Sequence, residues 1–513
     1  MSGFVPARGC GGRSEMDQTM TEDDQTTTVG PLPTPTTGKS TLPLVLTWLV
    51  WVLWAGSFVV LIAHLWSGGN WTVEGLVRID GLTLVVWVAA TFFSGIVHSY
   101  SRRYMAGSRT IDQFFGRVFA FTVVVMVLVA ADHVVLFGLA WLAMGLVMAE
   151  LIGHVEGWSQ ARAAKREARR YFVASSVTLG VALASLWVHT GATTVSGIGT
   201  SIGSPSLVVL FAAGALVLAA MIQSALLPFH TWLLSSMTAP TPASALMHAG
   251  FVNAGGILLA RFAPVVTVDP GFMLVVVLLG AVSALGGKLL KTVQTDAKGA
   301  LGCSTTGQMG FMIMQAGLGF FAAAVTHLVL HGSYKGYQFL ASGTQVAHES
   351  PTKSKAKAST TPFGVVVVLS TALAGGVLFA ALTGKGTKLD SGLLLTGLVV
   401  LTVLHATREV VSQAALPATI RYGAVPAVSL PALIIYAVVY RLIEGLMAGL
   451  PAIGQSAELT ALHAIVALAF LGAYLAIESG VYKHSQRLYV ALLNAGQPST
   501  ETMLTTKEEY NEY

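Results

Sequence analysis

From residue 41 almost to its end, the chain is a series of long apolar runs separated by short polar connections. A helix needs about 20 predominantly apolar residues to cross the hydrocarbon core of a bilayer. Measured against that length, the apolar runs predict about fourteen transmembrane helices. We expect them near residues 43–65, 80–100, 112–130, 132–153, 170–190, 205–228, 243–263, 271–293, 300–319, 321–343, 363–383, 390–411, 427–449 and 460–480.

The composition indicates the same class of protein. Of the 513 residues, 54% are hydrophobic and 10% are charged, whereas a soluble domain carries about a quarter charged residues. The two cysteines, Cys10 and Cys303, offer no disulfide framework and no iron–sulfur or zinc spacing. No basic face with interleaved aromatic residues indicates nucleic-acid binding. The sequence therefore predicts an all-α polytopic protein of the lipid bilayer, with no metal or cofactor of its own.

The two ends of the chain differ from its apolar middle. Residues 1–40 are polar and rich in Thr and Pro, which is typical of a disordered tail. They lack the short apolar core of a signal peptide. We expect a transmembrane domain over residues 41–485 and a C-terminal tail over 486–513.

The basic residues of the connections gather on one of the two sides that fourteen spans define. That side collects Arg102, Arg103, Arg109, Arg162, Lys165, Arg166, Arg169, Arg170, Lys298, Lys353, Lys355, Lys357, Arg421, Lys483 and Arg487. The other side holds Arg78, Lys385 and Lys388, with Arg261 at a helix end. Because cytoplasmic loops carry the excess of Lys and Arg, the pattern predicts a multi-pass protein of the cell membrane with both termini in the cytoplasm.

Three titratable residues share one face of an expected span. In "THLVLHGSYKGYQFL", His327, His331 and Lys335 follow one another at intervals of four, so they line one side of a helix near mid-membrane. A charged residue there costs about 2.5–3.5 kcal/mol on insertion scales and usually serves a function. Imidazole titrates near neutral pH and passes protons, and a buried lysine loses its proton more readily. A lone histidine is more often a packing residue, but three groups on one face favour an ion path.

A proline-rich junction precedes another histidine. The stretch "LLPFHTWLLSSMTAPTPASALMHAG" places Pro228, Pro240 and Pro242 between two apolar runs, and His248 follows directly. Proline breaks a helix, and helices broken at membrane depth line cavities and often mark ion sites. An ordinary loop between two helices is the alternative.

The other titratable residues of the spans carry weaker predictions. Glu150 and Lys288 lie nearer span ends, where their side chains can reach the membrane surface, and we treat them as secondary candidates. We interpret Arg408 with Glu409 and Arg441 with Glu444 as structural ion pairs. His463 and Glu478 are interpreted as packing residues. Histidines on facing helices could also bind haem, but His327 and His331 lie on one helix and suit one iron poorly.

Several motifs together carry a family resemblance. "PTPASALMHAG" (241–251), "TVQTDAKGALGCSTTGQMGFM" (292–312) and "HLVLHGSYKGYQFLASG" (327–343) resemble the antiporter-like membrane subunits of respiratory complex I and Mrp antiporters. "RIDGLTLVVWVAATFFSGIVHSYSRRYM" (78–105) and "FHTWL" (229–233) fit as well, so the resemblance covers roughly residues 78–345. Within that superfamily, "GQMGFMIMQAGLGFFAAAVTHLVLHGSYK" is similar to DabB subunits of inorganic carbon pumps.

The resemblance implies a fold, a partner and roles for particular residues. The family fold has two inverted repeats with broken helices. DabB-type subunits conduct protons or Na⁺ and drive a DabA-type partner, a zinc protein on the cytoplasmic face that hydrates CO₂. By motif, Lys335 matches the family's central lysine, His327 and His331 lead to it, and His248 matches the histidine of the first repeat's broken helix.

Two departures from the family pattern fall in the first repeat. Relatives in complex I have Trp-Glu where this chain has Trp141-Leu142, and Glu150 lies about two turns further on. Relatives have a lysine where this chain has Gln223, in "QSALLP". The expectation is that either the second repeat alone conducts or the first repeat is structural.

The sequence thus predicts the ion-translocating membrane subunit of an inorganic carbon (CO₂/bicarbonate) pump, with hydration chemistry left to the partner. The alternatives are a subunit of an NADH- or ferredoxin-linked oxidoreductase, a subunit of an Mrp-type cation/proton antiporter and, last, a haem-bearing redox subunit.

Overall fold

The computed structural model describes residues 40–342, 361–412 and 417–503. The chain divides into two units, residues 1–40 and 41–513, and every described helix and strand belongs to the second unit. Three parts of the predictions lie outside the described residues: the N-terminal tail up to residue 39, the loop lysines Lys353, Lys355 and Lys357, and the last ten residues.

All fourteen predicted spans form helices, which confirms the all-α polytopic fold. Eleven of the described helices are long and apolar enough to cross a membrane. They are α1 (Leu42–Ser67), α2 (Gly81–Tyr104), α3 (Ile111–Ala130), α4 (Val134–Ile152), α5 (Ser159–Thr190), α9 with α10 (Thr241–Ala249 and Ala254–Arg261), α12 (Pro270–Thr292), α15 (Pro362–Thr383), α16 (Ser391–Val411), α17 (Val425–Met447) and α18 (Ala461–Ser479).

The other three predicted spans are shorter or less apolar. They are α7 (Leu207–Gln223), α13 (Ala297–Gly317) and α14 (Phe321–Ala341). In α14 the polar residues are those of the predicted stripe. A hairpin of β1 (Trp71–Val73) and β2 (Val77–Ile79), paired antiparallel, lies between α1 and α2.

The proline-rich junction contains short helices, and the break lies further along than the prolines suggest. After α8 (Thr231–Ser235), α9 begins at Thr241 with Pro242 in its first turn and ends at Ala249. A 3₁₀ turn over Phe251–Asn253 then separates α9 from α10. The Asn253 side chain donates to the Ala249 carbonyl at 3.0 Å, which satisfies an acceptor at the break. His248 therefore lies just before a helix break rather than just after one.

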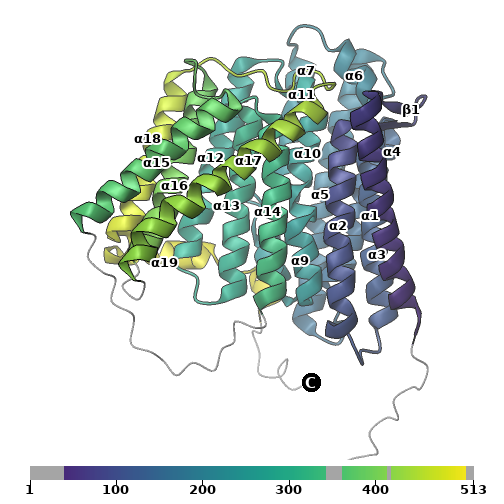
Figure 1. Cartoon of the computed structure of the whole chain (residues 1–513). Coiled ribbons are helices and arrows are strands. Elements are labelled where there is room, and N and C mark those ends of the chain that lie inside the picture. The colour runs from purple at the N-terminus through teal and green to yellow at the C-terminus, as the bar shows by residue number, and fades with distance from the viewer. Residues whose placement is uncertain (1–39, 343–360, 413–416, 504–513) are drawn as a thin grey trace, which may run out of the picture. The chain divides into compact units, whose positions relative to one another are not determined.

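Glycines set the close packing around the middle of the bundle, where α12, α13 and α14 stand side by side (Figure 1). At Gly287 on α12, an added Cβ would collide with the backbone of Gly307 on α13. At Gly332 on α14, it would lie 2.6 Å from the Ala249 carbonyl oxygen of α9. Small residues let membrane helices approach closely, so α14 is held directly against the helix that carries His248.

Part of the segment expected as a C-terminal tail is folded against the bundle. Residues 486–495 form α19 (Gln486–Ala495). His230 contacts the Ala495 carbonyl through Nε2 at 2.8 Å. The Ser499 N–H donates to Ser235 Oγ at 3.1 Å, and Thr502 is buried. The division at residue 485 stays a prediction.

Candidate functional site

The predicted stripe forms one face of α14. The rings of His327 and His331 stack with their centroids 5.3 Å apart. His331 and Lys335 are buried, and Lys335 is only 1% exposed. Because the three residues stand one helical turn apart, they make a continuous row of titratable groups through the middle of α14.

Lys335 and His248 meet at one turn of α13. The Lys335 ammonium donates to the Leu301 carbonyl at 3.2 Å, and the Thr305 hydroxyl donates to the same carbonyl at 2.9 Å. His248 Nδ1 lies 3.0 Å from that hydroxyl, and its ring stacks on Phe339 of α14. Three hydrogen bonds thus join residues that are 87 positions apart in the sequence.

Three imidazole nitrogens, two in the row and one in His248, are left without a partner among the described residues. The Nε2 atoms of His248, His327 and His331 are buried and make no hydrogen bond to any described residue. A buried polar atom left unpaired costs about 1–3 kcal/mol, and such an atom in a folded protein calls for an explanation such as bound water or a functional role. Water, or a proton passed between rings, would satisfy each of them.

A cavity of about 520 Å³, called here the polar cavity because several polar side chains stand in its otherwise mainly apolar wall, adjoins the row. It is lined from α12, α13, α14, α16, α17 and α18, and His327 forms part of its wall. Its polar lining includes Lys288, Gln308, Gln315, Thr402, His405 and Tyr474. A water takes about 30 Å³ of liquid volume, so the cavity can hold a chain of waters that reaches His327.

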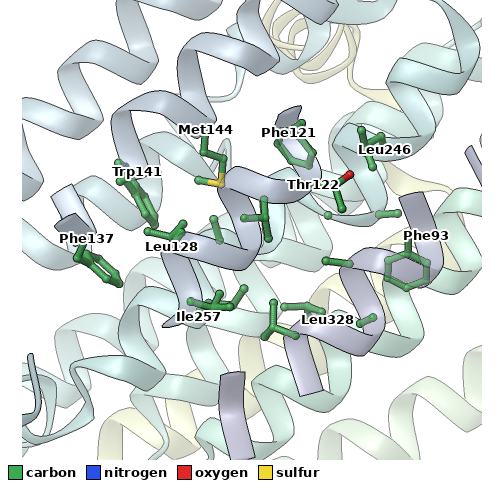
Figure 2. A pocket seen from close by; sticks show the side chains of 18 residues that line it. Phe93, Phe121, Thr122, Leu128, Phe137, Trp141, Met144, Leu246, Ile257 and Leu328 are labelled. Atoms are coloured by element: carbon green, nitrogen blue, oxygen red, sulfur yellow. The ribbon is translucent and has the colours of Figure 1, made fainter. Parts of the chain in front are cut away.

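The corresponding region of the first half is apolar and small. A cavity of about 40 Å³ lies among α2, α3, α4, α9, α10 and α14, and none of the 18 side chains that line it is titratable. Figure 2 shows Phe121, Phe137, Trp141 and Met144 around it, with the Thr122 hydroxyl as the labelled oxygen. Trp141 is 1% exposed, and its indole N–H donates to Ser175 at 3.1 Å. The region that lacks the relatives' glutamate is therefore packed with apolar groups.

The secondary candidates lie in three different settings. Glu150 accepts from Arg117 at 3.2 Å and from Lys165 at 2.7 Å near the end of α4, so it belongs to an ion-pair cluster. Gln223 is fully buried, and neither side-chain polar atom bonds to a described residue. The Lys288 ammonium lies 3.1 Å from His405 Nε2 and lines the polar cavity, so it does not reach the membrane surface as an isolated charge.

The structure corrects two of the expected structural roles. Arg441 pairs with Glu444 at 2.9 Å, which confirms that pair. Arg408 instead pairs with Glu478 at 3.1 Å, so its assignment to Glu409 is wrong. Adjacent residues of a helix do not face each other. Glu478 is consequently an ion-pair partner rather than a packing residue.

Two histidines near these sites were missed in the sequence. His405 is in contact with both Lys288 and Glu478. His98 is 1% exposed, bonds Ser94 O at 2.8 Å and leaves Nε2 unpaired among the described residues. The available signal was the same as for His327, a histidine within an apolar run. His463 Nδ1 accepts from the Thr460 N–H and caps α18, while its Nε2 is buried without a partner among the described residues. Its expected role as a packing residue stays a prediction.

Comparisons with known proteins point to one family. Residues 131–407 match the model described as "NADH:quinone oxidoreductase/Mrp antiporter, TM". Residues 66–115 match "NADH-Ubiquinone oxidoreductase (complex I), chain 5 N-terminus".

Curated relatives include two inorganic carbon transporter subunits and an oxidoreductase subunit. The chain is 38% identical over 289 residues to "Probable inorganic carbon transporter subunit DabB1" of Halothiobacillus neapolitanus, covering 54% of this chain and 51% of that protein. It is 34% identical over 347 residues to the DabB subunit of Bacillus anthracis, covering 66% and 67%. It is 34% identical over 285 residues to NADH-quinone oxidoreductase subunit L of Mycobacterium tuberculosis, covering 54% and 44%. The matches thus span about half to two thirds of these relatives' lengths.

A solved structure shares the fold. The "Structure of Mrp complex from Dietzia sp. DQ12-45-1b" superposes with a TM-score of 0.54 at 22% identity, over 92% of this chain and 53% of that one.

Proposed function

The chain belongs to the family of NADH:quinone oxidoreductase and Mrp antiporter transmembrane subunits, and from that premise we propose that it is the ion-conducting membrane subunit of an inorganic carbon pump. The observation that carries the proposal is the row of His327, His331 and Lys335 between a polar cavity and His248. The DabB relatives, which are named as inorganic carbon transporter subunits, supply the substrate class.

The proposed path runs through the second half of the chain. Ions enter through the second half, pass the row of His327, His331 and Lys335, and leave on the cytoplasmic side.

Lys335 is the central group of the path, because it is 1% exposed and, among the described residues, bonds to one carbonyl and to no carboxylate. When Lys335 loses or gains its charge, its hydrogen bond to the Leu301 carbonyl of α13 changes. Thr305 shares that carbonyl and contacts His248, so the charge state of Lys335 affects how α9 packs.

The chemistry of carbon hydration belongs to a partner in this proposal. A DabA-type zinc protein would bind the cytoplasmic face, and this chain would supply ion flow rather than a reaction. Both termini would lie in the cytoplasm, on the side that collects the basic loops. The membrane is the cell membrane, and the cargo is a proton or Na⁺.

A second candidate is an ion-translocating subunit of an NADH-quinone oxidoreductase-like complex or an Mrp-type antiporter. The similarity to the Mycobacterium tuberculosis subunit and the match to the complex I family model favour it.

Growth in air tests the proposal. Cells without carbonic anhydrase would receive this chain together with a DabA-type partner protein. We expect rescue that needs both proteins and is lost with Lys335→Met, which keeps the apolar stem of the side chain but removes its charge. Arg170→Gln, at an exposed ion pair with Glu501, serves as the control and should rescue normally.

Two results would contradict the carbon pump. Rescue by Lys335→Met at normal protein level would remove the lysine from the path. Failure of the well-expressed wild-type pair would move the assignment to the oxidoreductase or antiporter interpretation, for which a Na⁺/H⁺ flux assay is the next measurement.

A further inference from the structure

A second cluster of titratable groups begins at the wall of the polar cavity, where Lys288 and His405 stand. The Lys288 ammonium of α12 donates to His405 Nε2 of α16 at 3.1 Å. His405 Nδ1 lies 3.4 Å from Glu478 Oε1 of α18, and Arg408 Nε holds the other carboxylate oxygen at 3.1 Å. Three helices thus contribute to one connected row.

The hydrogen bonds orient the imidazole as a bridge. A neutral imidazole carries one proton, and the nitrogen that accepts a hydrogen bond is the bare one. Since Nε2 accepts from Lys288, Nδ1 carries the proton and points at the Glu478 carboxylate. Arg408 fixes that carboxylate, so the ring has a donor on one side and an acceptor on the other.

The cluster leads from the cavity toward one end of the bundle. Lys288, His405 and His327 all line the same cavity. Lys288 lies four residues before the end of α12, and Glu478 is the penultimate residue of α18. The cluster therefore connects the cavity with the end of the bundle at which α12, α16 and α18 finish.

A purely structural ion pair explains this arrangement poorly. A lysine that only stabilises a membrane domain is expected to contact a carboxylate directly, because a charge in the membrane interior costs about 2.5–3.5 kcal/mol. Among the described residues, Lys288 has an imidazole nitrogen as its hydrogen-bond partner instead. Lys291, Glu409 and Tyr474 are the other titratable groups around the cluster.

We propose that Lys288, His405 and Glu478 form a second proton relay, which connects the cavity beside His327 with the membrane surface where α12, α16 and α18 end, the cytoplasmic side in the proposed orientation. It rests on the proposed function. A proton passes from the Lys288 ammonium to His405 Nε2 and forms the imidazolium. The ring then rotates and gives the Nε2 proton to Glu478, which releases it to water. Lys288 is reprotonated from cavity water, and the neutral ring, still protonated on Nδ1, rotates back. One proton crosses per cycle, and reversal of each step gives the opposite direction.

The relay also specifies the cargo. Hard cations bind to several oxygen ligands, whereas the cluster presents two nitrogen groups that carry protons and one carboxylate already held by Arg408. The geometry suits a proton and not Na⁺.

Proton flux into liposomes tests the relay. The full chain, purified with the soluble protein co-expressed with it, would be reconstituted around a pH-sensitive dye in CO₂-containing buffer, with a potassium diffusion potential as the driving force. Lys288→Arg is the decisive variant, because arginine keeps the charge and the hydrogen bond but does not release its proton. Lys388→Arg, the same substitution at an exposed lysine outside the cluster, is the matched control. His405→Ala is measured with and without free imidazole.

We expect Lys288→Arg to lower proton flux by at least about tenfold, in line with the usual contribution of a positioned acid–base group. Lys388→Arg should stay near wild type, and imidazole should restore part of the flux of His405→Ala. Flux within twofold of wild type in both Lys288→Arg and His405→Ala would overturn the relay while Lys335→Met, still inactive, upheld the proposed function. Wild-type flux no greater than that of empty liposomes would overturn both.

Discussion

A buried ion pair at the other end of the bundle gives the sharpest stability prediction. Asp80 precedes α2 and caps it, accepting the Thr83 N–H at 3.0 Å. Its second oxygen pairs with Arg261 at the end of α10, and the guanidinium also donates to Thr83 Oγ1 at 2.9 Å and to the Val129 carbonyl at 2.7 Å. The two side chains are only 4% and 7% exposed. One pair thus joins α2, α3 and α10.

Removal of the carboxylate has two costs of different size. Asp80→Ala loses the cap, about 1 kcal/mol, and leaves the Arg261 guanidinium buried without its counter-charge, about 3–5 kcal/mol. Asp80→Asn keeps an acceptor for the Thr83 N–H and should show mainly the second cost. The double variant Asp80→Asn/Arg261→Met removes the buried Arg261 charge and leaves only the partly exposed Arg78, 3.7 Å from the same carboxylate in the wild type, without its partner. It should therefore be less destabilised than Asp80→Asn alone.

The pH dependence has a definite sign. Burial alone would raise the pKa of Asp80, but the Arg261 charge and the hydrogen bonds from Arg261 and Thr83 hold the pKa below its ordinary value. The pair therefore contributes fully above about pH 4 and is lost as the pH falls through the lowered pKa of the folded state.

The measurement is unfolding of the purified protein in detergent, followed by tryptophan fluorescence. Glu501→Gln is the control, because its pair with Arg170 is exposed by 60% and 68% and should contribute about 0–1 kcal/mol. If Asp80→Asn shifted stability no more than Glu501→Gln, or if the double variant were the least stable of all, the argument from a buried unpaired charge would be refuted.

Two further predictions concern residues outside the main row. Burial and the Arg117 charge lower the pKa of His154 to about 4, although the Glu156 charge acts in the opposite direction. Between about pH 4 and 6.5 the unfolded chain therefore binds more protons than the folded protein, and the folded protein loses stability on acidification. This loss should be smaller in His154→Gln, and equal pH profiles of stability for the two proteins would contradict the prediction. Gln223→Leu should leave proton flux unchanged and stability equal or higher, because both amide atoms are buried without a partner among the described residues; a loss of flux in the liposome assay would place Gln223 in the path.

The sequence was sufficient for the helices and for the row on α14, because both depend on local periodicity. Spacing alone places His327, His331 and Lys335 on one face. It does not reveal that His248 reaches the same turn of α13 as Lys335, because that contact depends on how α9 and α14 pack around Gly332. The Lys288–His405–Glu478 cluster was missed for the same reason. Its members are 117 and 73 residues apart in the chain, and each alone is an ordinary polar residue in an apolar helix.

The contrast between the two halves limits where ions can pass. A proton needs water or titratable groups along its whole path, and the first-half cavity is only about 40 Å³ and has no titratable side chain in its lining. The second half has a cavity of about 520 Å³ bordered by His327, Lys288 and His405. His248 then stands at the end of the second-half path rather than midway between two conducting halves. Its hydrogen bond to Thr305, on the turn that also holds Lys335, transmits the charge state of Lys335 to α9 two residues before the break at Gly250. In this proposed arrangement the first half responds to ion flow instead of carrying it.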